Sequence, residues 1–219
     1  ASLKANAPAQ EAPSGKTIAV IGGGPSGLST AWQLWMKGHT PVVYESAERL
    51  GGKITATIPD NRIPEDVVSH ELKRLHKLIR QINLKKPLTK KDFQKIKTKH
   101  DFVVIASGAQ KARTIPVNGH ELAVSALEFL RKSKANQIKV GRRVVIIGAG
   151  NVGCDAASEA ARLGAQDITL IDIQEPASFG VERKHAEKAG ARFLWPCFTK
   201  AIKKDGVELT SGELLPADT

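Results

Sequence analysis

The sequence predicts an α/β fold built from two copies of one strand–turn–helix–strand unit, each contributing to a parallel sheet. In both copies an apolar strand runs into a glycine-rich turn, which begins at Gly22 or at Gly148. The following helix ends at a glycine 16 positions further on in both copies (22 to 38, 148 to 164). The second strand closes on an acidic residue, 23 or 24 positions after the first glycine (22 to 45, 148 to 172). Agreement at three points indicates an internal repeat of a supersecondary unit.

The elements of each copy follow from local residue preferences. Thr17–Ile21 and Arg143–Ile147 are rich in β-branched residues, which favour strands. Pro25 suits the first turn of a helix, and Gly38 suits a helix end. The second strands are expected over Pro41–Tyr44 and Ile168–Ile171. Apolar residues at helical spacing predict the helices: Leu28, Ala31, Leu34 and Trp35 in the first copy, and Cys154, Ala157, Ala160 and Ala161 in the second.

Further elements are expected between the copies. The periodicity predicts a basic amphipathic helix over 71–82, a short helix over 91–97 and a helix near 124–132. Residues 101–105, DFVVI, form an apolar run that suits a strand buried on both faces of a parallel sheet. Residues 1–15 are rich in Ala and Pro without apolar periodicity, which predicts a flexible leader.

Length and composition exclude several classes of protein. The chain has 219 residues, of which 41% are hydrophobic and 25% charged, as in globular proteins and unlike disordered ones. Its two cysteines, Cys154 and Cys197, are too few for a disulfide framework or a four-thiolate iron–sulfur site. Neither a membrane-spanning run nor a signal peptide is visible, so a cytoplasmic location is expected. No residue spacing indicates a metal site.

The net charge of +11 comes from one segment. Residues 72–100 hold 11 Lys/Arg and one acid, Asp92, a net charge of +10, whereas residues 1–71 carry −1 and residues 101–219 carry +2. Three interpretations are open: a solvated basic face, a docking surface for an acidic protein, or a nucleic-acid site. Phe93 is the only Phe, Tyr or Trp in the segment, which disfavours a single-strand site with stacking aromatics.

The two glycine turns carry the chemistry. Each has the spacing G-x-G-x-x-G, at Gly22, Gly24 and Gly27 and again at Gly148, Gly150 and Gly153. In such a motif the first glycine makes a tight turn, the second lets the backbone approach a pyrophosphate, and the third lets helix and strand pack closely. The helix N-terminus adds unpaired N–H groups and a partial positive charge. Each motif follows a strand and opens a helix, so the sequence predicts two Rossmann-like dinucleotide-binding domains.

The acid after each second strand, Glu45 or Asp172, is placed to accept hydrogen bonds from an adenosine ribose. A carboxylate there disfavours a 2′-phosphate, and Ile173 and Gln174 supply no arginine to bind one, so the second site favours NAD(H) over NADP(H).

Two other motifs with known chemistry are not matched by the sequence. Gly15-Lys16-Thr17 resembles the end of a P-loop but precedes its strand, and Ser26 does not lie in G-x-S-x-G.

A set of segments in order resembles one family of flavoproteins: TIAVIGGGPSGLSTAWQL, YESAERLGGK, IPDNRIPEDVV, DFVVIASGA and VVIIGAGNVGCDAA. Over residues 16–219 the chain is similar to the FAD and pyridine-nucleotide module of the glutamate synthase small subunit. It is also similar to the flavin domains of dihydropyrimidine dehydrogenase and of NADH-linked ferredoxin reductases. The resemblance implies an FAD-binding segment over 16–112, a connector over 113–140 and an NAD(H)-binding domain over 141–219.

The resemblance also implies site residues. FAD would be bound by Gly22, Gly24, Pro25, Ser26, Gly27, Glu45, Gly51, Gly52, Lys53, Arg62, Ala106, Ser107 and Gly108. NAD(H) would be bound by Gly148, Gly150, Asn151, Val152, Gly153, Asp155 and Asp172. The implied chemistry is hydride transfer from NAD(P)H to FAD, and then electron transfer to an iron–sulfur protein or partner subunit, which the basic segment could dock. Hydride transfer requires no catalytic acid or base, and none is assigned.

The sequence departs from this family at two points. It has no cysteine clusters for iron–sulfur centres, and Cys154, on the motif helix, is expected to be a packing residue. Near the end, Asp218 resembles Asp101, which introduces an apolar strand, so the second domain is expected to be truncated at its C-terminal end. On this reading the chain binds FAD weakly, and the alternative function is a catalytically incomplete dinucleotide-binding module.

Overall fold

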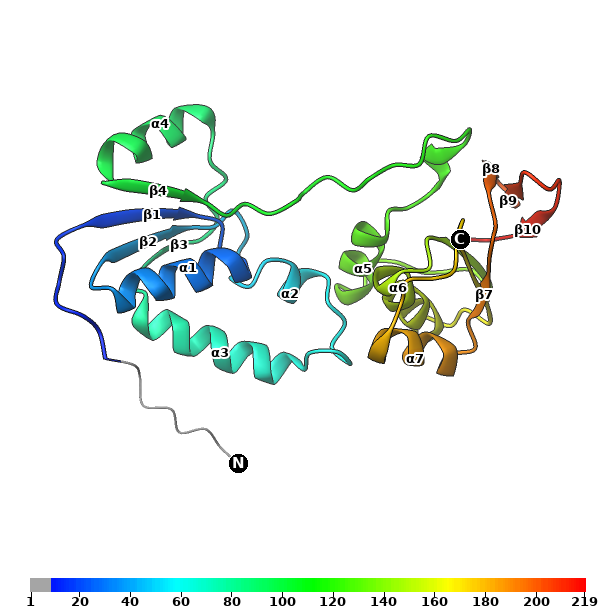
Figure 1. Ribbon diagram of the computed structural model, residues 1–219, viewed down its shortest axis with the longest axis horizontal. Coiled ribbons are helices and arrows are strands. Elements are labelled where there is room, and N and C mark those ends of the chain that lie inside the picture. The colour runs from blue at the N-terminus through cyan, green and yellow to red at the C-terminus, as the bar shows by residue number, and fades with distance from the viewer. Residues whose placement is uncertain (1–8) are drawn as a thin grey trace. The chain divides into compact units, whose positions relative to one another are not determined.

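The computed structural model describes residues 9–219, and residues 1–8 of the predicted leader lie outside the described part (Figure 1). The chain divides into two compact units. The first comprises the residues up to Ala56 together with Asp60–Gln110, and the second comprises Thr57–Pro59 together with Lys111–Thr219. None of the helices in the described range is long and apolar enough to cross a membrane.

The first unit is built on a four-stranded parallel sheet in the order β3-β2-β1-β4. The chain moves outward from β1 to β3 and then returns to β4 on the other side of β1. Right-handed crossovers therefore place α1 and α3 on one face of the sheet and α4 on the other, as Figure 1 shows. The elements are β1 (Thr17–Ile21), α1 (Pro25–Met36), β2 (Thr40–Tyr44), α2 (Lys53–Ala56), α3 (Glu65–Leu78), β3 (Gln81–Asn83), α4 (Lys90–Lys99) and β4 (Phe102–Ile105).

The core of this unit lies between the sheet and the helices α1 and α3. Val20 and Val43 of the two central strands are fully buried there, and Leu28 and Ala31 of α1 pack against them. Their spacing is the helical repeat seen in the sequence, which places one apolar stripe of α1 on the sheet.

Two expectations for the first unit need correction. The basic helix predicted over 71–82 begins earlier and ends earlier, at 65–78, because Glu65 and Asp66 follow Pro64 in its first turn and residues 81–83 form β3. The strand expected to be buried on both faces is an edge strand: β4 pairs with β1, and its Phe102 and Ile105 are 63% and 65% exposed.

The predicted leader includes residues that contact the first unit. Glu11 N–H donates to Met36 O over 2.8 Å, and Ser14 N–H donates to Gly38 O over 2.9 Å. The Lys37 ammonium pairs with the Glu11 carboxylate at 2.5 Å. Residues 11–14 are therefore attached to the end of α1, which the Ala/Pro-rich composition did not indicate.

The second unit repeats the plan with a parallel sheet in the order β5-β6-β7, to which an antiparallel sheet β8-β9-β10 is added. The antiparallel strands were not predicted. They bury Val207, Leu209 and Leu215 with Ile171 of β6. The elements are η1 (His120–Leu122), α5 (Ala126–Lys134), β5 (Arg143–Ile147), α6 (Asn151–Arg162), β6 (Asp167–Ile171), α7 (Gly180–Lys188), β7 (Arg192–Leu194), β8 (Thr199–Lys203), β9 (Gly206–Leu209) and β10 (Leu214–Pro216).

The helix α5, in the stretch expected to be a connector, contributes to the core of the second unit. Phe129 and Leu130 are buried with Cys154 and Ala157 of α6. Cys154 is fully buried, as expected of a packing residue, and its burial raises the pKa of the thiol.

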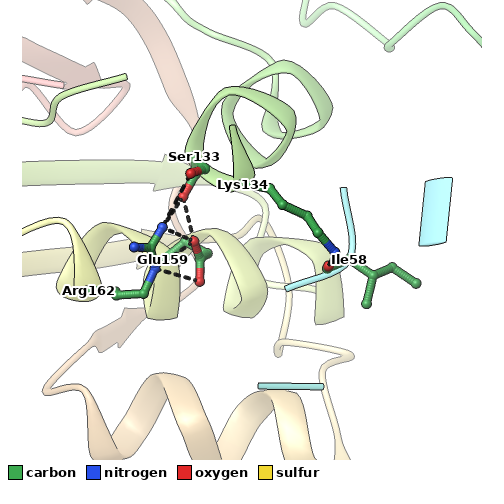
Figure 2. A network of polar contacts seen from close by, with 5 residues as sticks. All are labelled: Ile58, Ser133, Lys134, Glu159 and Arg162. Carbon is green, nitrogen blue, oxygen red and sulfur yellow. Dashed lines mark hydrogen bonds and ion pairs between the residues drawn. The ribbon is translucent and has the colours of Figure 1, made fainter. Parts of the chain in front are cut away.

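A buried polar network joins α5 to α6 (Figure 2). The Ser133 hydroxyl, which is fully buried, donates to the Glu159 carboxylate. Arg162 donates to both groups, at 2.9 Å to Ser133 Oγ and 2.8 Å to Glu159 Oε2. Next along α5, Lys134 Nζ donates to the carbonyl oxygen of Ile58 at 2.7 Å, so the short segment 57–59 is held within this unit.

Candidate functional site

The first glycine turn lies where the order of the parallel sheet reverses, between the carboxyl ends of β1 and β4. This switch point is where ligands bind in open α/β sheets. Gly22 has a φ of +111°, and a Cβ there would overlap the carbonyl oxygen of Ala106, which follows β4. A Cβ on Gly27 would overlap the carbonyl oxygen of Gly22. The predicted structural roles of the first and third glycines are thus confirmed.

Glu45 is bound to the turn itself. Its carboxylate is buried and accepts three hydrogen bonds, from Gly23 N–H at 2.6 Å, Ala47 N–H at 2.8 Å and the Ser46 hydroxyl at 3.1 Å. The sequence placed Glu45 near a ribose and missed its bond to Gly23. The acid fixes the glycine turn in place as well as lying beside it.

A second loop lies against the turn. Gly51 N–H donates to Gly23 O over 2.8 Å, and a Cβ on Gly52 would be 2.9 Å from Gly24 Cα. Both glycines have positive φ. This loop is attached to α3 by Arg49, which sequence reasoning missed: its guanidinium donates to Glu65, and to Ser69 Oγ at 3.1 Å.

The remaining predicted FAD-binding residues lie in the segments around the first glycine turn. The helix α1 begins at Pro25 without a side-chain cap, which leaves its first N–H groups available, and Ser26 is exposed there. Ser107 follows Ala106 and accepts a hydrogen bond on its carbonyl oxygen from Gln110 Nε2, while Gly108 has a φ of +69°. Lys53 and Arg62 are exposed, at the start of α2 and in the loop before α3.

The second glycine turn reproduces two hydrogen bonds of the first. Gly148 N–H donates to Ile171 O over 2.8 Å, as Gly22 N–H does to Tyr44 O. Ala149 N–H donates to Asp172 Oδ2 at 2.9 Å, as Gly23 does to Glu45. The other Asp172 oxygen accepts from Ile173 N–H at 2.8 Å. The internal repeat seen in the sequence is therefore a structural repeat.

Within the second turn, the third glycine again allows close packing, because a Cβ on Gly153 would overlap Gly148 O. Asn151 Oδ1 accepts from Phe179 N–H at 3.0 Å, which ties α6 to the loop before α7. Asp155 is buried on α6, whereas Val152 is 53% exposed.

The two turns differ in how far protein covers them. Ala106 and Ser107 lie against Gly22, whereas a Cβ on Gly148 or Gly150 would meet no described atom within 4 Å. Both turns have room for a dinucleotide at their second glycine. A Cβ on Gly24 would have its nearest neighbour at 3.8 Å, and like a Cβ on Gly150 it would fill space in front of the helix N-terminus. The backbone is open to a phosphate at the second glycine of each motif.

The basic segment is divided by the fold. Lys73, Arg74 and Lys77 lie on α3, whereas Lys95 and Lys99 lie on α4, across the sheet (Figure 1). Residues 72–100 are therefore two basic faces and not one.

Two glycine turns at the carboxyl ends of parallel strands, each bonded to an acid, define a protein with two dinucleotide-binding folds. The chain belongs to the pyridine nucleotide-disulphide oxidoreductase family, whose model matches residues 16–219. This family binds FAD and NAD(P), so the chain is an oxidoreductase of the flavoprotein class. Both described cysteines are free and lie far apart in the sequence.

Individual proteins agree with this assignment. The glutamate synthase [NADPH] small chain of Azospirillum brasilense is 28% identical over 94% of this chain and 46% of its own length. The NAD-dependent dihydropyrimidine dehydrogenase subunit PreT of Escherichia coli O157:H7 is 30% identical over 81% of this chain and 43% of its own. The resemblance to these groups is confirmed, and the chain spans less than half the length of either relative.

Among solved structures, 2-naphthoyl-CoA reductase aligns with 97% of this chain and 33% of its own, with a TM-score of 0.76 and 21% identity. This likeness supports the fold: two α/β units with parallel sheets, as the sequence predicted.

Proposed function

We propose that the first unit binds FAD, the second binds NAD(H), and the chain passes electrons from NADH through FAD to an iron–sulfur or partner-subunit acceptor. The observation that carries this proposal is the repeat of one turn geometry, in which Gly23 is bonded to Glu45 and Ala149 to Asp172. When bound, the nicotinamide supplies a hydride and the flavin accepts it.

The chain's own residues hold and orient the two groups. The uncapped N-terminus of α1 and the open backbone at Gly24 suit the pyrophosphate of FAD, and Glu45, fixed by Gly23, presents its carboxylate to the ribose. In the second unit Gly150 and Asp172 have the same roles. No side chain is assigned to proton transfer.

A preference for NADH rests on the end of β6. Asp172 is held by two backbone N–H groups, and the next residue, Ile173, is apolar and 60% exposed. A carboxylate repels a 2′-phosphate, and Ile173 offers it no positive charge. The names of the relatives include both NADPH and NAD, so they do not decide between the two. The proposed preference therefore rests on the residues of this chain.

A partner subunit is supported by the names of the relatives, which are called small chain and subunit. We place its docking on the part of the basic segment 72–100 that lies before and at the start of α4, because the lysines gathered there suit an acidic partner. Changing Lys85, Lys86, Lys90 and Lys91 to Glu is expected to slow transfer to a protein acceptor and to spare NADH oxidation with a small dye.

The electron-transfer function is tested by anaerobic titration of the FAD-supplied protein with NADH, followed through the visible flavin band. Bleaching of this band supports the proposal. If FAD and NADH both bind without bleaching, the chain is a dinucleotide-binding module that lacks catalysis. If FAD in excess does not bind, the assignment of the first unit fails.

A further inference from the structure

A two-residue protrusion of the backbone lies beside the acid of the second glycine turn. Asp172 N–H donates to Leu194 O over 3.1 Å, and Cys197 N–H donates to Asp172 O over 2.8 Å. These two bonds bracket Trp195 and Pro196, which lie between β7 and β8. The backbone on both sides of the protrusion is therefore fixed to the residue that is assigned to the ribose.

The first unit has the same arrangement beside its own acid. Glu45 N–H donates to Asn83 O over 2.8 Å, and Lys86 N–H donates to Glu45 O over 2.8 Å. The two bracketed residues are here Leu84 and Lys85. The bracket is thus part of the structural repeat, so a difference between the bracketed pairs is a difference between the two nucleotide turns.

The bracketed pairs differ in chemistry and in burial. In the first unit, Leu84 is half-buried against the core, and the Lys85 ammonium pairs with Glu48 at 2.6 Å. In the second unit, Trp195 and Pro196 are both exposed, and 43% of Trp195 is open to solvent. The second unit therefore presents an aromatic ring where the first has an aliphatic side chain and an ion pair.

The ring of Trp195 is carried by a firmly anchored backbone. Leu194 and Cys197, on either side of the protrusion, pack against the core that contains Ile171. The next residue along the chain is also fixed, because Thr210 N–H donates to Phe198 O over 2.8 Å. A ring held in this way loses little conformational entropy when a ligand stacks on it.

The surroundings of Asp172 suit the base of a nucleotide. Ile173 follows this acid directly and is 60% exposed, and the bracketing bonds place Trp195 close to the backbone of the same acid. In an adenosine the base is bonded directly to the ribose, so a ribose at Asp172 brings its base to these neighbouring residues. Every base has a flat π-face, which suits an exposed aromatic ring.

We propose that the adenine of the second nucleotide stacks on Trp195 and that Ile173 completes the apolar contact. This inference rests on the proposed function for the assignment of NAD(H) to the second unit. It adds a specificity-determining residue that the sequence motifs did not indicate. The contact belongs to the second unit, since Leu84 and Lys85 occupy the corresponding places in the first.

The test measures the binding of NADH and of ADP-ribose to the full chain by calorimetry. The protein is first supplied with FAD, so that the first turn is filled. ADP-ribose contains the adenosine and the pyrophosphate of NADH and lacks the nicotinamide. Trp195→Ala is expected to weaken both ligands by the same factor, about tenfold or more, because a stacked base loses its aromatic partner. Trp195→Phe keeps a ring and should bind within about threefold of wild type.

Three further measurements separate a contact with the base from a structural role. Trp195→Leu keeps an apolar side chain without a ring and should recover less affinity than Trp195→Phe. The other two tryptophans, Trp32 and Trp35, lie on α1 of the first unit, so ADP-ribose should change the tryptophan fluorescence of the wild type and not that of Trp195→Phe. Phe102→Ala removes an exposed aromatic side chain from β4 and, as the matched control, should leave both affinities unchanged.

Several results would overturn the proposal. Wild-type affinity for ADP-ribose in Trp195→Ala would do so and would leave NADH binding by the second unit standing. Equal recovery in Trp195→Leu and Trp195→Phe would assign the effect to apolar packing instead of stacking. If the wild type binds neither ligand, the assignment of NAD(H) to the second unit fails as well. Bleaching of the flavin band by NADH, recorded on the same samples, tests electron transfer separately from the contact with the base.

Discussion

Asp218 is bound to Arg143 by the same two hydrogen bonds, one accepted by its carboxylate and one donated by its N–H, that join Asp101 to Thr17. Arg143 N–H donates to Asp218 Oδ2 over 2.9 Å, and Asp218 N–H donates back to Arg143 O over 2.9 Å. Thr17 and Asp101 make the corresponding bonds at 2.8 and 2.9 Å. Each acid therefore fixes the first residue of the strand that leads into a glycine turn, β1 or β5. The likeness of Asp218 to Asp101 expected from the sequence is confirmed at the level of individual bonds.

Replacing Asp218 should destabilise the second unit through β5. Asp218→Ala removes the acceptor for Arg143 N–H and the ion pair with the Arg143 guanidinium, which lies 2.5 Å away. Asp218→Asn keeps an acceptor oxygen and loses the charge. Thermal unfolding should therefore give melting temperatures in the order wild type, Asn variant, Ala variant. An Ala variant as stable as wild type would show that the bonds have no role in stability.

The antiparallel sheet should lose stability in acid. Lys200 and Lys203 both pair with Glu208 and lower the pKa of its carboxyl from 4.5 to about 2. A lowered pKa in the folded state contributes stability that is complete above about pH 4.5 and is lost as the pH falls towards about 2. Glu208→Gln should flatten the dependence of the melting temperature on pH within this window. An unchanged slope in the variant would contradict the assignment.

Substitutions at two glycines of the second motif should have different effects, one on stability and the other on NADH binding. A Cβ on Gly153 would overlap Gly148 O, so Gly153→Ala should lower the free energy of unfolding by about 1–3 kcal/mol, the usual cost of overpacking. Gly150 has a φ of −77° and no described atom within 4 Å of a Cβ. Gly150→Ala should therefore fold like wild type and bind NADH at least about tenfold more weakly, because its methyl group occupies the phosphate space. Calorimetry and an NADH titration measure the two effects. Wild-type NADH affinity in Gly150→Ala would exclude a pyrophosphate at this turn.

Nucleotide preference should depend on the residues that follow β6. In the double variant D172N/I173R, the introduced asparagine keeps an acceptor for Ala149 N–H while the negative charge is lost and a cation is added. The ratio of the NADPH to the NADH dissociation constant should fall by about tenfold or more. The single variant Asp172→Asn serves as the control for the charge alone. Tighter binding of NADPH than of NADH by the wild type would end the proposed preference.

The polar network between α5 and α6 should contribute to the stability of the second unit. Ser133→Ala removes a fully buried hydroxyl that bonds both Glu159 and Arg162, and should lower the free energy of unfolding by about 1–3 kcal/mol. Ser158→Ala, on α6, is the matched control, because within residues 9–219 its hydroxyl bonds to Cys154 O of the same helix and joins no second element. Chemical denaturation of both variants tests this. Equal losses would assign the effect to the removal of a hydroxyl in general.

The repeated unit was predictable because its signals are local. The glycines at 22, 27, 148 and 153 are required by a turn or by a close approach within a few residues of themselves. The bond from Glu45 to Gly23 was not predictable in the same way, since it joins residues 22 positions apart through a backbone N–H that any residue could supply. Arg49 was missed for a similar reason: its partners, Glu65 and Ser69, lie on a helix whose start was placed too late. The exposure of β4 was missed because apolar composition does not indicate which strand ends a sheet.

The bond between Lys134 and Ile58 has a consequence for how the protein is made. Its two residues are 76 positions apart, and Ile58 belongs to a three-residue excursion that the chain makes about midway through the first unit, before Asp60–Gln110 has been synthesised. A fragment starting at Lys111 would contain every helix and strand of the second unit and still lack the carbonyl that Lys134 binds. The second unit is thus assembled from two separate stretches of chain, one of which emerges from the ribosome well before the other, and its complete folding must wait for both.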